Sequence, residues 1–278
     1  MEWSKLKNVI LLILVGVNLF FVVLIAYRQS KTVYLEQEAK EDLIQALNIN
    51  GISMGTAQFP QENKWPNLQI NWNVEQARGI AEAVLGNVTE ESRGSATVYT
   101  GADGSAVFYS DGVFSVAVNV KQEHLSRQAA EEYAKLLIQQ MGLETGPLEE
   151  QTTEDETISF VAIQQAEGYG VFNCPITITY AEDGIFSMQG TCLLGEIKYR
   201  AAQQSTISVF TALTKLIQYE ADHGSGIKEI QFIQVGYLLP TISASTVQLE
   251  PVWHVTTDHG QYDVSGTTGI VKKTGSKI

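Results

Sequence analysis

The chain has 278 residues, and its 31 acidic residues outnumber its 18 basic ones, giving a net charge of −13 at pH 7. Nucleic-acid phosphates need a basic footprint, so this balance argues against a nucleic-acid partner. It argues equally against binding along an anionic membrane surface, and we interpret the acidity as a feature that favours solubility.

A tail of residues 1–8 is followed by an uncharged, almost wholly apolar segment, residues 9–27. Its length is close to the roughly 20 residues that a helix needs to cross a bilayer. It is longer than the apolar core of a cleaved signal peptide, and its exit, Ala26-Tyr27-Arg28, is a poor cleavage site. The sequence therefore predicts a single, uncleaved transmembrane helix, whose orientation the balanced flanking lysines and arginines leave open.

Two residues inside this segment are candidate contacts with a transmembrane partner. Gly16 permits close approach of another helix, and Asn18 carries an amide that can form hydrogen bonds between helices. Two other roles for Asn18 are a hydrogen bond within its own helix and a contact with a second copy of the chain.

A juxtamembrane helix is predicted for residues 28–51. Leu35, Ala39, Leu43 and Leu47 recur at every fourth position, and Gly51 is a typical helix end.

The remaining chain alternates helices with groups of strands, three times. The predicted helices begin after the capping residues Asn73, Ser126 and Ser205. The predicted strands are 68–72, 96–100, 106–110, 113–120, 158–164, 170–181, 185–194, 228–237, 249–257, 261–264 and 269–272. This order predicts an α+β fold with antiparallel sheets, divided into a first module (52–122) and a second (123–278). The second module holds helix–strand units near 123–195 and 205–273.

Cys174 and Cys192 flank a predicted hairpin turn that ends at Gly184. A three-residue loop, 182–184, places the two cysteines directly opposite each other, whereas a two-residue turn places their sulfurs on opposite faces. The sequence leaves two alternatives open, a disulfide or two small buried free cysteines.

A search for catalytic chemistry finds no motif. HExxH, CxxC, GxSxG and phosphate-binding glycine loops are absent from the sequence. His254, Asp258 and His259 are close enough to suggest a metal, but an Asp-His-Gly sequence is more typical of a turn. The acidic run 149–156 lacks the spacing of a calcium loop and is interpreted as solvated. We therefore predict no catalytic, cofactor or metal site, and no enzymatic activity.

The opening MEWSKLKNVILLILVGVNLFF resembles the YycI members of the YycH/YycI family of bacterial regulatory proteins. The likeness lies in the Met-acid-Trp-Ser-Lys start, the immediate single span, Asn18 near its middle, and a late Pro-x-Trp strand.

This resemblance implies an anchor in a Gram-positive plasma membrane, with the N-terminus cytoplasmic and most of the chain outside the cell. It also implies regulation of the WalK (YycG) sensor histidine kinase, which controls cell-wall metabolism, together with a YycH-like sister protein. The alternative is a membrane-tethered module that binds wall or peptide ligands without a kinase partner.

Overall fold

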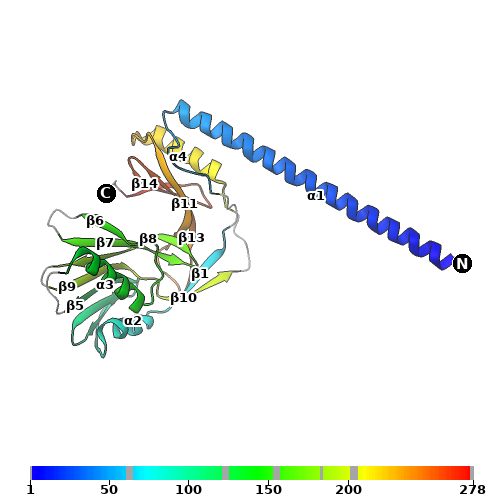
Figure 1. Cartoon of the computed structure of the whole chain (residues 1–278). Coiled ribbons are helices and arrows are strands. Elements are labelled where there is room, and N and C mark those ends of the chain that lie inside the picture. The colour runs from blue at the N-terminus through cyan, green and yellow to red at the C-terminus, as the bar shows by residue number, and fades with distance from the viewer. Residues whose placement is uncertain are drawn as a thin grey trace. The chain divides into compact units, whose positions relative to one another are not determined.

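The computed structural model describes residues 2–60, 65–120, 125–152, 157–181, 184–200 and 206–275 (Figure 1). It divides into two compact units, Met1–Met54 and Gly55–Ile278. Each is described by itself.

The first unit is dominated by one helix, α1 (Glu2–Ile49). The predicted apolar segment and the predicted juxtamembrane helix are thus parts of one continuous helix. It ends at a turn in which Gly51 has φ of +73°, a conformation that favours glycine. Near this end Leu43 and Leu47 are buried. Within the described residues, no helix combines the length and the apolar character needed to cross a membrane, so the predicted span is not confirmed.

The second unit contains a large sheet of twelve strands. They are β2 (Thr89–Arg93), β3 (Ala96–Thr100), β4 (Gly104–Tyr109), β5 (Val113–Asn119), β6 (Glu149–Thr152), β7 (Ile158–Ala166), β8 (Tyr169–Tyr180), β9 (Ile185–Thr191), β11 (Ile230–Leu238), β13 (Glu250–Thr257), β14 (Gly260–Ser265) and β15 (Val271–Gly275). The strand order is β15-β14-β13-β11-β8-β9-β5-β4-β3-β2, with β7 paired to β8 and β6 to β7. Because β5 pairs with β9, strand pairing runs across the module boundary predicted between residues 122 and 123.

Strand β8 joins the two halves of this sheet. Its first residues pair in parallel with β11, at Gly170 and Val171, and its later residues pair in antiparallel fashion with β9. Between the two regions the Asn173 amide donates to the carbonyl oxygen of Leu239 and accepts from its N–H, both at 2.8 Å. The side chain thus takes the place of a backbone partner where β8 changes neighbours.

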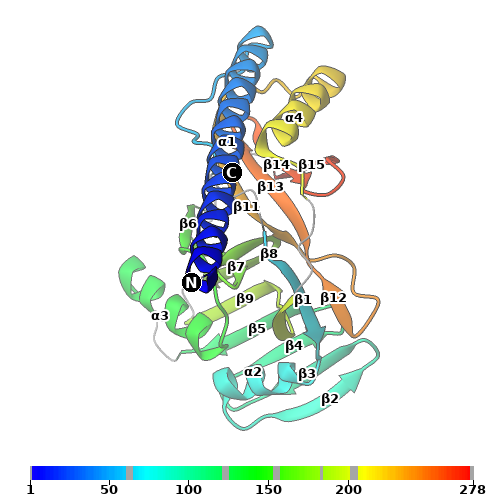
Figure 2. The ribbon, with the colours of Figure 1, turned by 90° about the vertical axis from the view of Figure 1, so that its right-hand side faces the viewer.

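Two helices cover the half of the sheet that contains β3 to β9. Helix α2 (Gln76–Leu85) packs on β3 and β4, and α3 (Arg127–Gln140) packs on β7 and α2 (Figure 2). Ser126 caps α3 as predicted, since its hydroxyl accepts from the N–H of Ala129 at 3.2 Å. Alanines at four-residue spacing, such as Ala130 and Ala134, are fully buried and let α3 lie close to its neighbours.

The other half of the sheet is covered by α4 (Val209–His223), which packs on β14 and β15. Trp253 and Tyr262 are buried on the sheet, and the Trp253 indole donates to the carbonyl oxygen of Ile207. The capping residue of α4 is Ser208, whose hydroxyl accepts from the Thr211 N–H. The prediction of Ser205 as the cap was therefore wrong, and that residue lies outside the described residues.

A smaller sheet of three strands has the order β10-β1-β12, formed by β1 (Asn67–Trp72), β10 (Gly195–Arg200) and β12 (Thr246–Gln248). Leu68 and Ile70 of β1 are fully buried in a core shared with Tyr237 and Leu249. Among the described residues, every strand pair in both sheets is antiparallel except β8 with β11. The mixed α+β fold with mainly antiparallel sheets is therefore confirmed.

Candidate functional site

The two residues predicted to contact a transmembrane partner lie on α1. A Cβ atom added at Gly16 would meet nothing within 4 Å, so this side of the helix is open. The Asn18 amide donates to the carbonyl oxygen of Leu14 at 2.8 Å, one turn earlier. The structure therefore shows the hydrogen bond within the helix, one of the alternatives for Asn18. That bond uses a single N–H, and the second N–H and the carbonyl oxygen have no partner among the described residues.

Apolar side chains surround these two residues on every side of α1. Ile13, Leu14, Val15, Val17, Leu19, Phe20, Phe21 and Val22 are each about half exposed or more. Such a surface is unfavourable in water, so it marks a region that other apolar groups cover.

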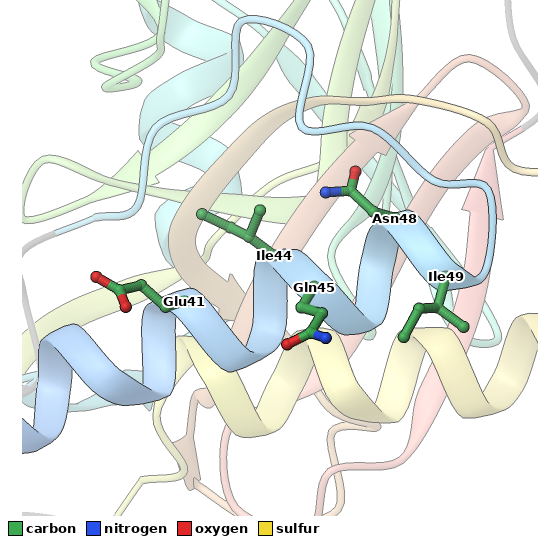
Figure 3. A pocket seen from close by; sticks show the side chains of 5 residues that line it. All are labelled: Glu41, Ile44, Gln45, Asn48 and Ile49. Atoms are coloured by element: carbon green, nitrogen blue, oxygen red, sulfur yellow. The ribbon is translucent and has the colours of Figure 1, made fainter.

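A shallow depression of about 460 Å³ lies on the last turns of α1. It is lined by Glu41, Ile44, Gln45, Asn48 and Ile49. Figure 3 shows that Gln45 and Ile49 point to the same side of the helix, one turn apart. Its residues all come from one helix, and no group of converging polar atoms marks a ligand site there.

The register of the cysteine hairpin is that of a three-residue loop. Ile176 pairs with Gly190 and Tyr180 with Phe186, and Gly184 has φ of +82°. This confirms the register that places Cys174 opposite Cys192. Residues 182 and 183 of the loop lie outside the described residues.

Cys174 and Cys192 are nevertheless free thiols, and both are fully buried. Burial in apolar surroundings raises the pKa of each to about 12, and for Cys174 the neighbouring Cys192 adds to the increase. Both are therefore neutral at physiological pH and poor nucleophiles. In this structure the two cysteines are small, buried residues without a bridge.

The histidines suggested for a metal do not come together. Asp258 and His259 form the turn between β13 and β14, with the His259 ring 3.0 Å from the Asp258 carboxylate. The other Asp258 oxygen accepts from the N–H groups of Lys228 and Glu229, both at 3.0 Å. Burial raises the pKa of Asp258, but these backbone bonds and His259 outweigh it and lower that pKa overall. No cluster of ligands suited to a metal occurs among the described residues.

His254 instead pairs with a residue that the sequence did not single out. Its Nδ1 lies 2.7 Å from Oδ1 of Asp263, directly across the β13–β14 ladder, and both side chains are buried. The ring of Phe172 stacks on the imidazole with 4.0 Å between centroids. The second carboxylate oxygen of Asp263 is buried and has no hydrogen-bond partner among the described residues.

Asp263 is one of the residues that line a small pocket of about 150 Å³. Its lining comes from the same face of neighbouring strands and from the turn after β14: Leu238, Glu250, Val252, Asp263, Ser265, Thr268, Ile270 and Lys272. Val252 and Ser265 are buried, whereas Ile270 and Lys272 are exposed at the rim. The pocket therefore combines two carboxylates, one ammonium group and an apolar wall.

A larger cleft of about 570 Å³ lies between α2, the end of α3, β7 and β10. Three carboxylates line it, from Glu75, Glu144 and Glu167. Below them Gln164 is buried, donating to the carbonyl oxygen of Thr191 at 3.2 Å and accepting from the Leu193 N–H at 2.8 Å. This amide holds the segment after β9 against β7.

Comparison with known proteins supplies the family. No curated protein matches the chain. One similar solved structure is an uncharacterized protein from Eubacterium rectale, 13% identical, with a TM-score of 0.47, covering 81% of this chain and 85% of that one. Another is the C-terminal domain of Bacillus megaterium YpeB, 14% identical, with a TM-score of 0.41, covering 74% and 98%. A family model described as YycI protein matches residues 30–270. Because this match spans most of the chain, the protein belongs to the YycI family, a family of regulatory proteins.

Proposed function

We propose that the protein regulates the WalK (YycG) sensor histidine kinase of a two-component system that controls cell-wall metabolism. The observation that carries this proposal is the family match over residues 30–270, because the YycI family is associated with that kinase system. The partners are the kinase and a YycH-like sister protein.

We further propose that residues 9–27 cross the plasma membrane once, with the N-terminus in the cytoplasm and the larger unit outside the cell. Support comes from the uninterrupted helix α1 and from the exposed apolar residues around Asn18. A helix that is apolar on all sides is typical of a segment in lipid or packed among other helices.

In this proposal α1 contacts a transmembrane helix of the kinase. Lipid tails are as apolar as leucine, so apolar side chains alone give little drive for helices to associate. Gly16 allows close approach, and the unused N–H and carbonyl oxygen of Asn18 can bond across the contact. Such a bond contributes about 0.6 kcal/mol on average. A partner that binds one kinase state better by this amount changes the ratio of states about threefold.

The test is co-purification of the full chain with the kinase in detergent, comparing Asn18→Leu with the wild type. We expect insertion to be unchanged and association to fall about threefold, as one hydrogen bond is lost. The matched control is Val22→Leu, which keeps the surface apolar and should leave association unchanged. Replacing residues 9–27 by an unrelated apolar helix should change kinase output while the larger unit still folds.

Equal association for Asn18→Leu and the wild type would remove the amide from the contact. Unchanged kinase output after replacement of the whole segment would contradict regulation through the bilayer. That result would favour the alternative, a tethered module for wall or peptide ligands, which the 570 Å³ cleft supports because its size suits a small ligand.

A further inference from the structure

Strand β10 leaves one edge of the small sheet open. In the order β10-β1-β12 it is an outer strand, and within the described part of the chain no strand pairs with its other side. An open edge presents backbone N–H and carbonyl groups that a strand of another chain can use. The edge of β10 is therefore a candidate docking surface.

The register of the ladder shows which backbone groups point outward. The Asn73 N–H donates to the carbonyl oxygen of Leu194 at 3.0 Å, directly before the β1–β10 pairs. Hydrogen-bonded pairs alternate along an antiparallel ladder, so the backbone groups of Ile197 and Tyr199 point away from β1. The Gly195 N–H, at the first outward position, agrees with this, since it donates to a glutamine side chain of α2. The backbone groups of Ile197 and Tyr199 have no hydrogen-bond partner among the described residues.

The cleft of about 570 Å³ adjoins the same strand. Ile197 belongs to its lining, and the side chains of Ile197 and Tyr199 lie on one face of β10 because they are two positions apart. The Tyr199 hydroxyl donates to the Glu167 carboxylate at 2.8 Å, which holds one acidic group of the cleft beside the edge. The open edge and the cleft therefore form one continuous surface.

The charge of this surface has one sign. Glu75, Glu144 and Glu167 line the cleft, all three are exposed, and none forms an ion pair with a described residue. The described residues of the lining include no lysine, arginine or histidine. The uncharged part of the lining includes the apolar side chains of Ile80 and Leu143. Such a cleft complements a cation that is carried on an apolar stem.

We propose that β10 binds an extended segment of another protein as an added strand, and that a lysine or arginine of this segment enters the cleft. The backbone of the segment bonds to the outward groups of Ile197 and Tyr199. Every second side chain of an added strand lies on the cleft side of the sheet, so backbone bonds supply affinity and the cleft supplies specificity. The cation lies among the three carboxylates, and its stem contacts Ile80 and Leu143.

This site does not rest on the proposed kinase contact, because every residue that forms it belongs to the second unit and none to α1. Peptide binding is measured without the kinase. Its failure would leave kinase association untouched, and loss of the α1 contact would leave peptide binding intact.

The experiment is ligand-observed NMR on the full chain in nonionic detergent, with detergent alone as the blank. The probe is the capped peptide Val-Thr-Lys-Thr-Val, whose composition favours a strand and whose lysine and valines share one face. We expect a dissociation constant on the order of 0.1 mM, since a short flexible peptide loses entropy on binding. The same peptide with glutamate in place of lysine should bind at least about tenfold more weakly, because like charges repel in the cleft. Absence of binding by the lysine peptide, or equal binding by the glutamate peptide, would overturn the proposal.

A second probe separates strand addition from capture of the cation alone. The lysine peptide N-methylated along its backbone keeps its charge but loses its N–H donors. It should bind at least about tenfold more weakly than the unmodified peptide, because strand addition depends on backbone bonds. Equal affinity of the two peptides would overturn the added strand.

Variants locate the cation. Glu75→Gln combined with Glu144→Gln should weaken binding of the lysine peptide about fivefold, because two partners of the cation are lost from solvated positions. The matched control, Glu132→Gln combined with Asp222→Asn, removes the same charge from exposed positions outside the cleft and should bind as the wild type does. Equal losses in the two double variants would overturn the placement of the cation in the cleft.

Amide hydrogen exchange locates the edge. The N–H groups of Ile197 and Tyr199 should exchange fast in the free protein and slowly with the lysine peptide bound. Exchange in β2, an outer strand of the large sheet, should not change. Unchanged rates at both Ile197 and Tyr199 with the peptide bound would overturn its placement along β10.

Discussion

Replacement of Gln164 by leucine tests whether one buried amide holds β7 to the segment after β9. The side chain is 2% exposed and forms two hydrogen bonds, at 3.2 Å to Thr191 and 2.8 Å to Leu193. Leucine is similar in size to glutamine, so the main change is the loss of these two hydrogen bonds. The Leu193 N–H left without a partner costs about 1–3 kcal/mol, and the bond to Thr191 contributes about 1 kcal/mol. The free energy of unfolding should therefore fall by about 2–4 kcal/mol.

The assay is urea unfolding of the full chain in detergent, followed by tryptophan fluorescence. The midpoint should fall while the slope with denaturant stays the same, because the folded structure is unchanged. Gln165→Leu is the matched control on the next position of β7, where the side chain is only half-buried, and its effect should stay within about 0.5 kcal/mol. If Gln164→Leu unfolds at the same midpoint as Gln165→Leu, the reasoning is refuted.

Two further predictions concern the joint in the sheet and the thiols. Gly236→Ala should destabilise the protein, because the added Cβ atom would lie 2.4 Å from the Phe172 ring. Gly79→Ala should stabilise α2 by about 1 kcal/mol, because a Cβ atom there meets nothing within 4 Å. Unfolding midpoints of the two variants that do not move in opposite directions would contradict this. Cys174 and Cys192 should resist alkylation in the folded protein at pH 8 and react once it is unfolded. Because burial raises their pKa to about 12, stability should fall as pH rises above about 9, where only the unfolded state loses the protons; a midpoint constant from pH 8 to 11 would contradict it.

Much of the fold follows from local sequence rules, and the exceptions have physical causes. Ser126 was predicted as a cap because its hydroxyl precedes an apolar helical pattern. Ser205 and Ser208 both satisfy that rule, so the pattern alone could not choose between them. Strands β2 and β6 are absent from the predicted strands because the residues of β2 are polar and exposed and those of β6 are mostly acidic or polar. The acidic run 149–156, interpreted as solvated, begins with β6. Pairing with neighbouring strands, not a buried face, makes them strands.

The pair of His254 and Asp263 was not predicted, although the turn length after β13 indicates it. The relation between turn length and strand register that places Cys174 opposite Cys192 also applies to the turn after β13. Thr257 pairs with Gly260, so a two-residue turn places His254 opposite Asp263. A three-residue turn, Asp258 to Gly260, as between the predicted strands 249–257 and 261–264, shifts every pair by one. The position of Lys272 opposite Asp263 depends in addition on β15, whose pairing with β14 has a register irregularity that no local rule predicts.

The small sheet has a consequence for the order in which the chain folds. Asn67 of β1 pairs with Arg200, 133 residues later, and Ile70 pairs with Val247, 177 residues later. Strand β1 is made early, but both of its edges stay unpaired until most of the chain has been synthesised. Pairing over such separations is slow, and an unpaired apolar strand is a template for association with other chains. The interval between the appearance of β1 and that of β12 is therefore when the newly made protein most needs protection from aggregation.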